Sequence, residues 1–187
     1  MTAQEIFSQL TKHMVEGLMI HSQLSDYYYF LGLEGYGMCH EYHYYSENVN
    51  YKNTAKFFMN HYHMFVSELR TDIPEIIPET WYQHVSEDVS YETRKAYIQK
   101  GIEKWVEWES DTKKFYQEMY QELMGAGEAA CAAYVLDLIQ DVSEELAYAK
   151  HKHLTLLAHN YDMPTIMAEQ EAIYKKCHKK LKEIKYD

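Results

Sequence analysis

Glycine and proline are scarce in this sequence, at 7 and 3 of 187 residues. These two residues supply many tight turns, so their scarcity argues against a fold of short strands and favours long helices. The chain also has no uninterrupted apolar run of about 18 residues, the length that suggests a membrane-spanning helix. We therefore expect a helical protein with no membrane partner, formed by a single domain over residues 1–187 that can bury a sizeable core.

Cysteine is also rare, and its three positions, Cys39, Cys131 and Cys177, are far apart in the sequence. They form no C-x-x-C pair and their number is odd, which predicts a reducing compartment and no structural disulfides. The first residues lack the basic and apolar regions of a secretory signal. The expected location is therefore the cytoplasm.

Basic residues are in deficit, because 18 Lys and Arg stand against 29 Asp and Glu, for a net charge of −11. Binding to a nucleic-acid backbone is driven by Lys and Arg, so nucleic acid is not an expected partner. The sequence also lacks the G-x-S-x-G, H-E-x-x-H and P-loop signatures of common hydrolases. An acidic chain is also suited to attract cations.

The sequence has a strong helical periodicity. Apolar side chains recur every three or four residues along five long stretches. The predicted helices cover residues 3–33, 38–69, 91–124, 128–158 and 164–185. Five such helices with no strand pattern between them predict an all-α fold.

The connections between the predicted helices differ in length. Gly32, Gly35 and Gly37 predict a short turn, so the first two helices should be antiparallel neighbours. Residues 70–90 contain two prolines and form a connection of roughly twenty residues, which is long for adjacent helices. A long crossover of this kind joins the second and third helices of some four-helix bundles. We therefore predict a four-helix bundle with a long crossover and an additional C-terminal helix.

The second predicted helix changes character along its inner face. Its later half carries an ordinary apolar stripe that includes Phe58 and Tyr62, but the same face passes through His40, Tyr44 and Glu47 earlier in the helix. A buried carboxylate without a partner costs several kcal/mol. Either this half of the helix is a solvated end of the bundle, or a polar group such as a metal ion lies against it.

Acidic residues also lie near the middle of the other long helices. Glu16 is on the first helix and Glu109 is on the third, on or beside the inner face. The fourth helix offers Asp141, Glu144 or Glu145. Antiparallel helices bring such residues to similar heights, and carboxylates with imidazoles favour iron or manganese.

In architecture, nearly the whole chain resembles the ferritin-like superfamily, which includes ferritins, rubrerythrins and mini-ferritins. That family supplies one Glu from each of two helices and a Glu-x-x-His motif from each of the other two. The stretches that stand at the two motif positions are Glu47-Asn-Val-Asn50 on the second helix and, on the fourth, either Asp141-Val-Ser-Glu144 or Glu145-Leu-Ala-Tyr148. None of these stretches has the His of the family motif.

The resemblance implies a set of metal ligands on the four bundle helices. These candidates are Glu16, Glu47, Asn50, Glu109, Asp141, Glu144 and His21. Because the two motif histidines are absent, three alternatives stay open. The site uses other histidines such as His21, His40 or His43, or it binds a single ion, or the bundle keeps the fold without metal.

The function implied by the resemblance is that of a metal-binding protein with iron or manganese as its cofactor. Its chemistry would be metal oxidation, metal storage or peroxide handling at a carboxylate site inside the bundle, as in a ferroxidase-like di-metal oxidoreductase. Ferritin-like proteins self-associate, so a homo-oligomer is expected. The alternative is a metal-free acidic helical protein that serves as an interaction or structural module, whose polar interior would be closed by internal hydrogen bonds.

Overall fold

The computed structural model describes residues 1–63 and 90–186, and every regular element within them is an α-helix. The helices are α1 (Ala3–Phe30), α2 (Glu34–Tyr62), α3 (Tyr91–Gly125), α4 (Ala129–Ala158) and α5 (Met163–Tyr186). The predicted all-α class and the additional C-terminal helix are thereby confirmed. None of these helices is both long and apolar enough to cross a membrane.

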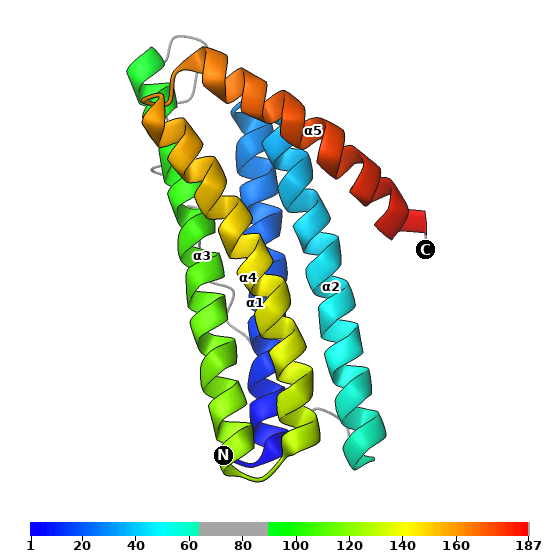
Figure 1. Cartoon of the computed structure of the whole chain (residues 1–187). Coiled ribbons are helices and arrows are strands. Elements are labelled where there is room, and N and C mark those ends of the chain that lie inside the picture. Colours follow the sequence, from blue (N-terminus) through cyan, green and yellow to red (C-terminus); the bar gives the residue numbers. More distant parts are fainter. Residues whose placement is uncertain (64–89, 187) are drawn as a thin grey trace.

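The first four helices form a bundle of two helical hairpins (Figure 1). Helix α1 packs along α2, and α3 packs along α4. Figure 1 shows α2 and α3 running in the same direction, while α1 and α4 run in the opposite one. The predicted crossover and the predicted last turns of the second helix fall on residues 64–89, outside the described part of the chain.

The helix ends follow local capping chemistry. Thr2 accepts a hydrogen bond from the backbone of Glu5, whose side chain accepts one from the backbone of Thr2, so the two residues form a capping box. Ser90 caps α3 through its hydroxyl group, which accepts from the backbone N–H of Thr93. Helix α2 ends at Tyr62 because the next residue, His63, has a left-handed backbone with φ of 53°.

The turn between α1 and α2 is shorter than predicted, because α1 ends at Phe30 and α2 begins at Glu34. Only Gly32 of the three glycines needs its freedom there, with φ of +73°. Gly35 lies inside α2, and a Cβ atom at that position would lie 2.2 Å from the backbone oxygen of Gln170 on α5. This glycine is therefore required for close helix packing and not for the turn.

The core is divided into two apolar clusters along the length of the bundle. One contains Leu10 and other residues from the N-terminal half of α1. The other contains Leu24 and further residues from the C-terminal half of that helix. Between the clusters, α2 buries His43 and Glu47, and α3 buries Glu109. A polar layer therefore crosses the middle of the bundle.

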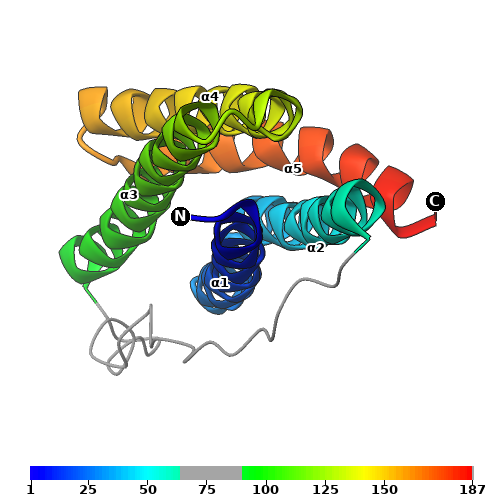
Figure 2. The same cartoon turned by 90° about the horizontal axis from the view of Figure 1, so that it is seen from below.

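Helix α5 crosses one end of the bundle, packs against the first part of α2 and then diverges from it toward the C-terminus (Figures 1 and 2). It buries Ile166, Ile173 and Cys177 in the same cluster as Leu24. An ion pair between Lys152 of α4 and Glu169 of α5 supports this arrangement. Helix α5 thus covers the side of the bundle where α2 and α4 face each other.

Candidate metal centre

Five potential metal ligands meet in the polar layer, and all four bundle helices contribute. We call this group the central cluster. Its members are His21 of α1, His43 and Glu47 of α2, Glu109 of α3 and Glu145 of α4. Four of the five are buried, and Glu145 is half-buried. Apolar packing holds these side chains in place, because one core cluster lies on each side of the polar layer along the bundle.

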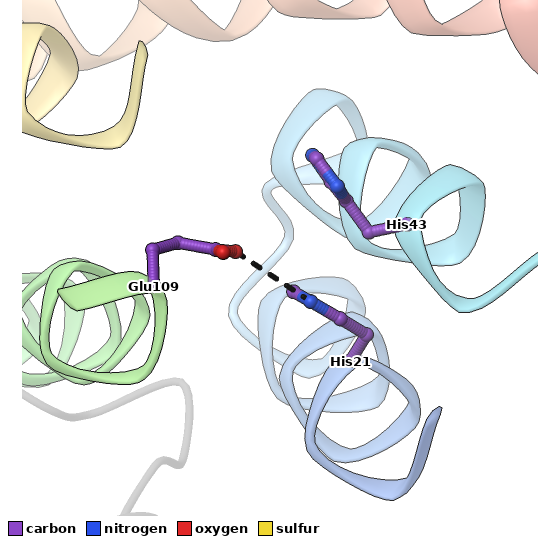
Figure 3. Close-up of side chains that lie close together, drawn as sticks. All are labelled: His21, His43 and Glu109. Atoms are coloured by element: carbon purple, nitrogen blue, oxygen red, sulfur yellow. Dashed lines mark ion pairs between the residues drawn. The ribbon is translucent and has the colours of Figure 1, made fainter. Parts of the chain in front are cut away.

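Figure 3 shows Glu109 and His21 pointing toward each other across the bundle, with His43 on the adjacent helix α2. One ligand atom from each of His21, His43 and Glu109 lies within 4.8 Å of the other two. The His21 Nε2 atom is 3.6 Å from Oε1 of Glu109, and the His43 Nδ1 atom is 3.3 Å from Oε1 of Glu145. Two imidazoles and the Glu109 carboxylate therefore lie close enough to share a cation, and Glu145 lies beside His43.

Neighbouring side chains hold two of these groups in position. The indole N–H of Trp105 donates a hydrogen bond of 3.1 Å to Oε1 of Glu109. The Nδ1 atoms of His21 and His40 lie 3.1 Å apart in a hydrogen bond. When the His21 nitrogen is the donor, its Nε2 atom carries a lone pair toward Glu109. Such an outer hydrogen bond fixes the orientation and tautomer of metal-binding histidines.

The carboxyl groups of Glu47 and Glu109 resist ionisation. Burial, and then the charge of Glu145, raise the pKa of Glu47 from 4.5 to about 8. Burial, and then Glu145 and Glu47, raise the pKa of Glu109 well above its ordinary value. A cation placed among these groups would reverse the repulsion and release their protons, because metals bind the ionised carboxylate.

The imidazoles of His21 and His40 are neutral for the same physical reason. Burial lowers the pKa of His21 well below 6.5, and the neighbouring His43 and His40 lower it further. The pKa of His40 is lowered by burial and by His43. Neutral imidazole is the form that binds metal ions. His21 therefore offers a nitrogen donor without a competing proton at physiological pH.

Helix α1 leaves room for the Trp108 ring by carrying a glycine in its middle. A Cβ atom at Gly17 would lie 3.5 Å from the Glu47 carboxyl carbon and 3.3 Å from the Trp108 ring. A mid-helix glycine costs about 1 kcal/mol relative to alanine. Here it relieves a tight approach to the Trp108 ring, while Glu47 lies beside α1 at an ordinary contact distance.

The polar layer is not closed by hydrogen bonds among the described residues. The Oε2 atom of Glu47 and the Nε2 atom of His40 are buried there without a hydrogen-bond partner. Leaving such groups unpaired costs about 1–3 kcal/mol each. An unpartnered carboxylate oxygen, raised carboxyl pKa values and neutral imidazoles together fit a hard divalent cation with oxygen and nitrogen ligands.

The candidates taken from the sequence are divided between this cluster and the surface. His21, Glu47 and Glu109 lie in the central cluster. Glu16 is half-buried near Lys12 and His13, with its carboxylate 3.9 Å from the Nδ1 atom of His13. The remaining three, Asn50, Asp141 and Glu144, line a cavity between α2, α4 and α5, outside the group of closest ligand atoms.

That cavity, which we call the α5 cavity, has a volume of about 580 Å³. His43 and Glu145 belong both to its wall and to the central cluster. The cavity also contains Lys176 and Lys180 of α5 among acidic residues of α4. It therefore provides a route between solvent and the buried ligands.

The sequence pattern does not single out His43 and Glu145 as ligands, although both are among its open alternatives. A search for Glu-x-x-His puts the histidine after the acid, whereas His43 precedes Glu47 by one helical turn. On α4 the buried residues Val142, Leu146 and Ala149 define the inner face. Glu145 lies between them, so the apolar spacing carries the signal that distinguishes it from Glu144.

A second group of potential ligands lies at the bundle end where α2 ends and α4 begins. His61, Glu128 and Cys131 place one ligand atom each within 4.8 Å of one another. His61 is exposed, and the Cys131 thiol is 3.1 Å from the hydroxyl group of Tyr62. Any measurement of metal content must therefore distinguish this group from the central cluster.

No protein-family model matches this chain, and no curated protein matches its sequence. Solved structures do resemble it. An engineered closed form of the Archaeoglobus fulgidus ferritin matches with a TM-score of 0.74 and 14% identity, over 93% of this chain and 96% of that one. An open-pore ferritin from the same archaeon gives 0.73 at 14% identity, over 91% and 94% of the two chains. A humanized archaeal ferritin gives 0.72 at 13% identity, over the same shares. The chain therefore has a ferritin-like fold.

Proposed function

We propose that the central cluster binds ferrous iron and supports its oxidation, which makes the chain a ferritin-like iron-handling protein. The observation that carries the proposal is the convergence of two imidazoles and three carboxyl groups from four helices in one layer of the bundle. Ferrous iron is the substrate of this reaction, and dioxygen or hydrogen peroxide is the oxidant. The solved ferritins that share the fold support this choice of metal.

The donor set accounts for the affinity of the proposed site. His21, His43 and Glu109 would hold the ion, and Glu47 and Glu145 would add oxygen donors and negative charge. Burial between two apolar clusters keeps water away, so charges inside the layer interact more strongly than they would at the surface. Oxygen and nitrogen ligands also suit manganese, which is the expected competing ion.

The metal-free alternative predicts a polar layer closed by internal hydrogen bonds. Glu47 and His40 each have a buried polar atom without such a bond, which favours a ligand over a closed network. The interaction-module function is therefore the weaker proposal. Self-association into a homo-oligomer and a cytoplasmic location stay predictions, and sedimentation and cell fractionation would measure them.

The test compares two Glu→Gln variants on α3. Glu109→Gln keeps the shape of a cluster ligand but removes its charge. The control, Glu107→Gln, lies two residues earlier on α3 and removes an exposed carboxylate that is 2.8 Å from the Lys104 amine. Protein stripped with a chelator is titrated with Fe(II) without oxygen and is then exposed to air while oxidation is followed by absorbance. We expect Glu109→Gln to weaken binding by more than about tenfold, because outer hydrogen-bond partners alone change metal affinity by 10–100-fold. The Glu107→Gln variant should match the parent.

Equal binding and oxidation by the parent and Glu109→Gln would contradict the proposal. A Cys131→Ser variant shows whether the second ligand group contributes to the measured stoichiometry, since that substitution removes its thiol. We expect this variant to retain ferrous oxidation.

A further inference from the structure

Two of the three cysteines, although distant in sequence, meet where α5 crosses α2. Cys39 and Cys177 are both buried, at 1% and 2% exposure, and belong to the same apolar cluster. Their thiol groups are close enough to influence each other's pKa, and both line the α5 cavity. The third cysteine, Cys131, lies in the other apolar cluster, beside Tyr62.

The surroundings of this pair suit a reactive dithiol more than an inert core contact. The cavity that the two thiols line also contains His43 and Glu145, and two lysines of α5 lie in its wall. A hydrogen bond from a neighbouring thiol stabilises a thiolate, and lysines nearby do the same. A cysteine that served only to fill the core would need neither a second thiol beside it nor a cavity that opens to solvent.

We propose that Cys39 and Cys177 are a redox-active pair that reduces hydrogen peroxide and closes to a reversible disulfide between α2 and α5. This inference goes beyond the proposed iron chemistry and requires no metal. It places peroxide consumption in the cavity through which peroxide would reach the central cluster. The substrate class is a small hydroperoxide, because the thiols are buried and only the cavity leads to them.

The chemistry balances with peroxide as the only oxidant. The Cys177 thiolate attacks one peroxide oxygen, so that an S–O bond forms, the O–O bond breaks and the departing hydroxide takes a proton to become water. Cys39 then loses its proton and attacks the Cys177 sulfur, so that the S–S bond forms and the S–O bond breaks, releasing a second water. Two thiols are oxidised by two electrons, and one peroxide is reduced to two waters.

Cys177 is assigned the attacking role because of its electrostatic environment. The neighbouring Cys39 thiol lowers the pKa of the Cys177 thiol to about 7. The same interaction, followed by burial, raises the pKa of Cys39. The pair therefore holds one ready thiolate and one protonated partner, the arrangement that an attacking and a resolving cysteine need.

The test uses the reduced full-length protein after removal of metal by a chelator. Hydrogen peroxide is added in equal amount, the reaction is quenched with acid, and the unfolded chain is treated with an alkylating reagent. We expect the parent to retain one alkylated cysteine, Cys131, and to yield a peptide with Cys39 joined to Cys177. Three free thiols after treatment, or a link only between different chains, would overturn the proposal.

Three single variants separate the roles of the thiols. Cys177→Ser should consume peroxide at least about tenfold more slowly than the parent, because the attacking thiolate is absent. Cys39→Ser should leave a sulfenic acid on Cys177 that dimedone traps. Cys131→Ser is the matched control and should consume peroxide at the parent rate. Peroxide consumption that depends on Cys131 and not on Cys177 would refute the assignment, and the peptide map of the parent stands even where a variant folds poorly.

Failure of this inference is distinguishable from failure of the proposed iron chemistry. If no disulfide forms while the parent oxidises iron and Glu109→Gln does not, the thiol pair is structural and the metal centre stands. If the disulfide forms while Glu109→Gln oxidises iron as the parent does, the thiol site stands and the metal assignment fails.

Discussion

Replacing Glu47 by glutamine should raise the free energy of unfolding of the metal-free protein. It should also reduce the stabilisation that metal binding gives. Burial and Glu145 raise the pKa of Glu47 from 4.5 to about 8. Between these two pH values the folded state keeps a proton that the unfolded state has released. The free energy of unfolding therefore falls by about 1.4 kcal/mol for each pH unit in that range. The penalty of the parent reaches about 3 kcal/mol at pH 7, because about 2.5 pH units separate 4.5 from 7.

The sign follows from the direction of the shift. A raised carboxyl pKa stabilises the folded state fully below pH 4.5, and this contribution disappears as the pH rises toward about 8. Glutamine cannot ionise, so Glu47→Gln should unfold with nearly the same free energy as the parent at pH 4.5. At pH 7 it should be more stable by about 3 kcal/mol. The pKa of Glu109 is also raised, so the stability of Glu47→Gln should still fall with pH, but less steeply than that of the parent.

Urea denaturation of chelator-treated protein at a series of pH values from 4.5 to 8.5 measures this effect. The control is Glu144→Gln, which removes one exposed carboxylate from α4 outside the central cluster. Parallel pH dependences for the parent and Glu47→Gln would refute the assignment of a buried, protonated Glu47. Addition of Mn(II) should reverse the order, because binding stabilises the parent more than the variant.

Three further outcomes follow from the geometry. His40→Ala should weaken metal binding by about 10–100-fold, measured by calorimetric titration with Mn(II), since His40 orients His21 by a 3.1 Å hydrogen bond; unchanged affinity would show that the bond is incidental. Metal binding at pH 7 should release protons, because Glu47 retains its proton there in the metal-free state, and the heat of binding should depend on the buffer; equal heats in buffers of different ionisation enthalpy would contradict this. Thr2→Ala should lower the free energy of unfolding by about 1 kcal/mol through loss of the α1 cap and should leave metal affinity as in the parent; an effect on affinity would mean that the helix end is coupled to the site.

The sequence is sufficient to predict the fold class because helical periodicity and end signals agree along the chain. Thr2 and Ser90 have the side chains of N-caps, and both cap helices in the structure. Pro164 suits the first turn of a helix, and it lies in the first turn of α5. The start of α2 is harder to predict from the sequence, because a glycine inside a helix looks the same as a glycine in a turn until the residues packed against it are known. Gly35 is explained only by the backbone of α5 beside it.

The ligand set is harder to predict than the fold. His21, Glu47 and Glu109 are recoverable because each lies on or beside the inner face of its helix. Glu144 and Glu145 differ by a rotation of about 100° about the helix axis, and only the apolar spacing of Val142, Leu146 and Ala149 favours Glu145 as the inward residue. Contacts between distant segments, such as Gly17 beside Glu47 and Cys39 beside Cys177, leave no periodic signal in the sequence.

The central claim is that a divalent cation binds in the polar layer, and anomalous X-ray diffraction from crystals soaked with Mn(II) tests it most directly. The account predicts an anomalous peak enclosed by His21, His43 and Glu109, at about 2.0–2.3 Å from ligand atoms, a distance typical of divalent metals. A Glu109→Gln crystal soaked in the same way should lose that peak. An empty polar layer in the parent, or a peak only at His61, Glu128 and Cys131, would contradict the account.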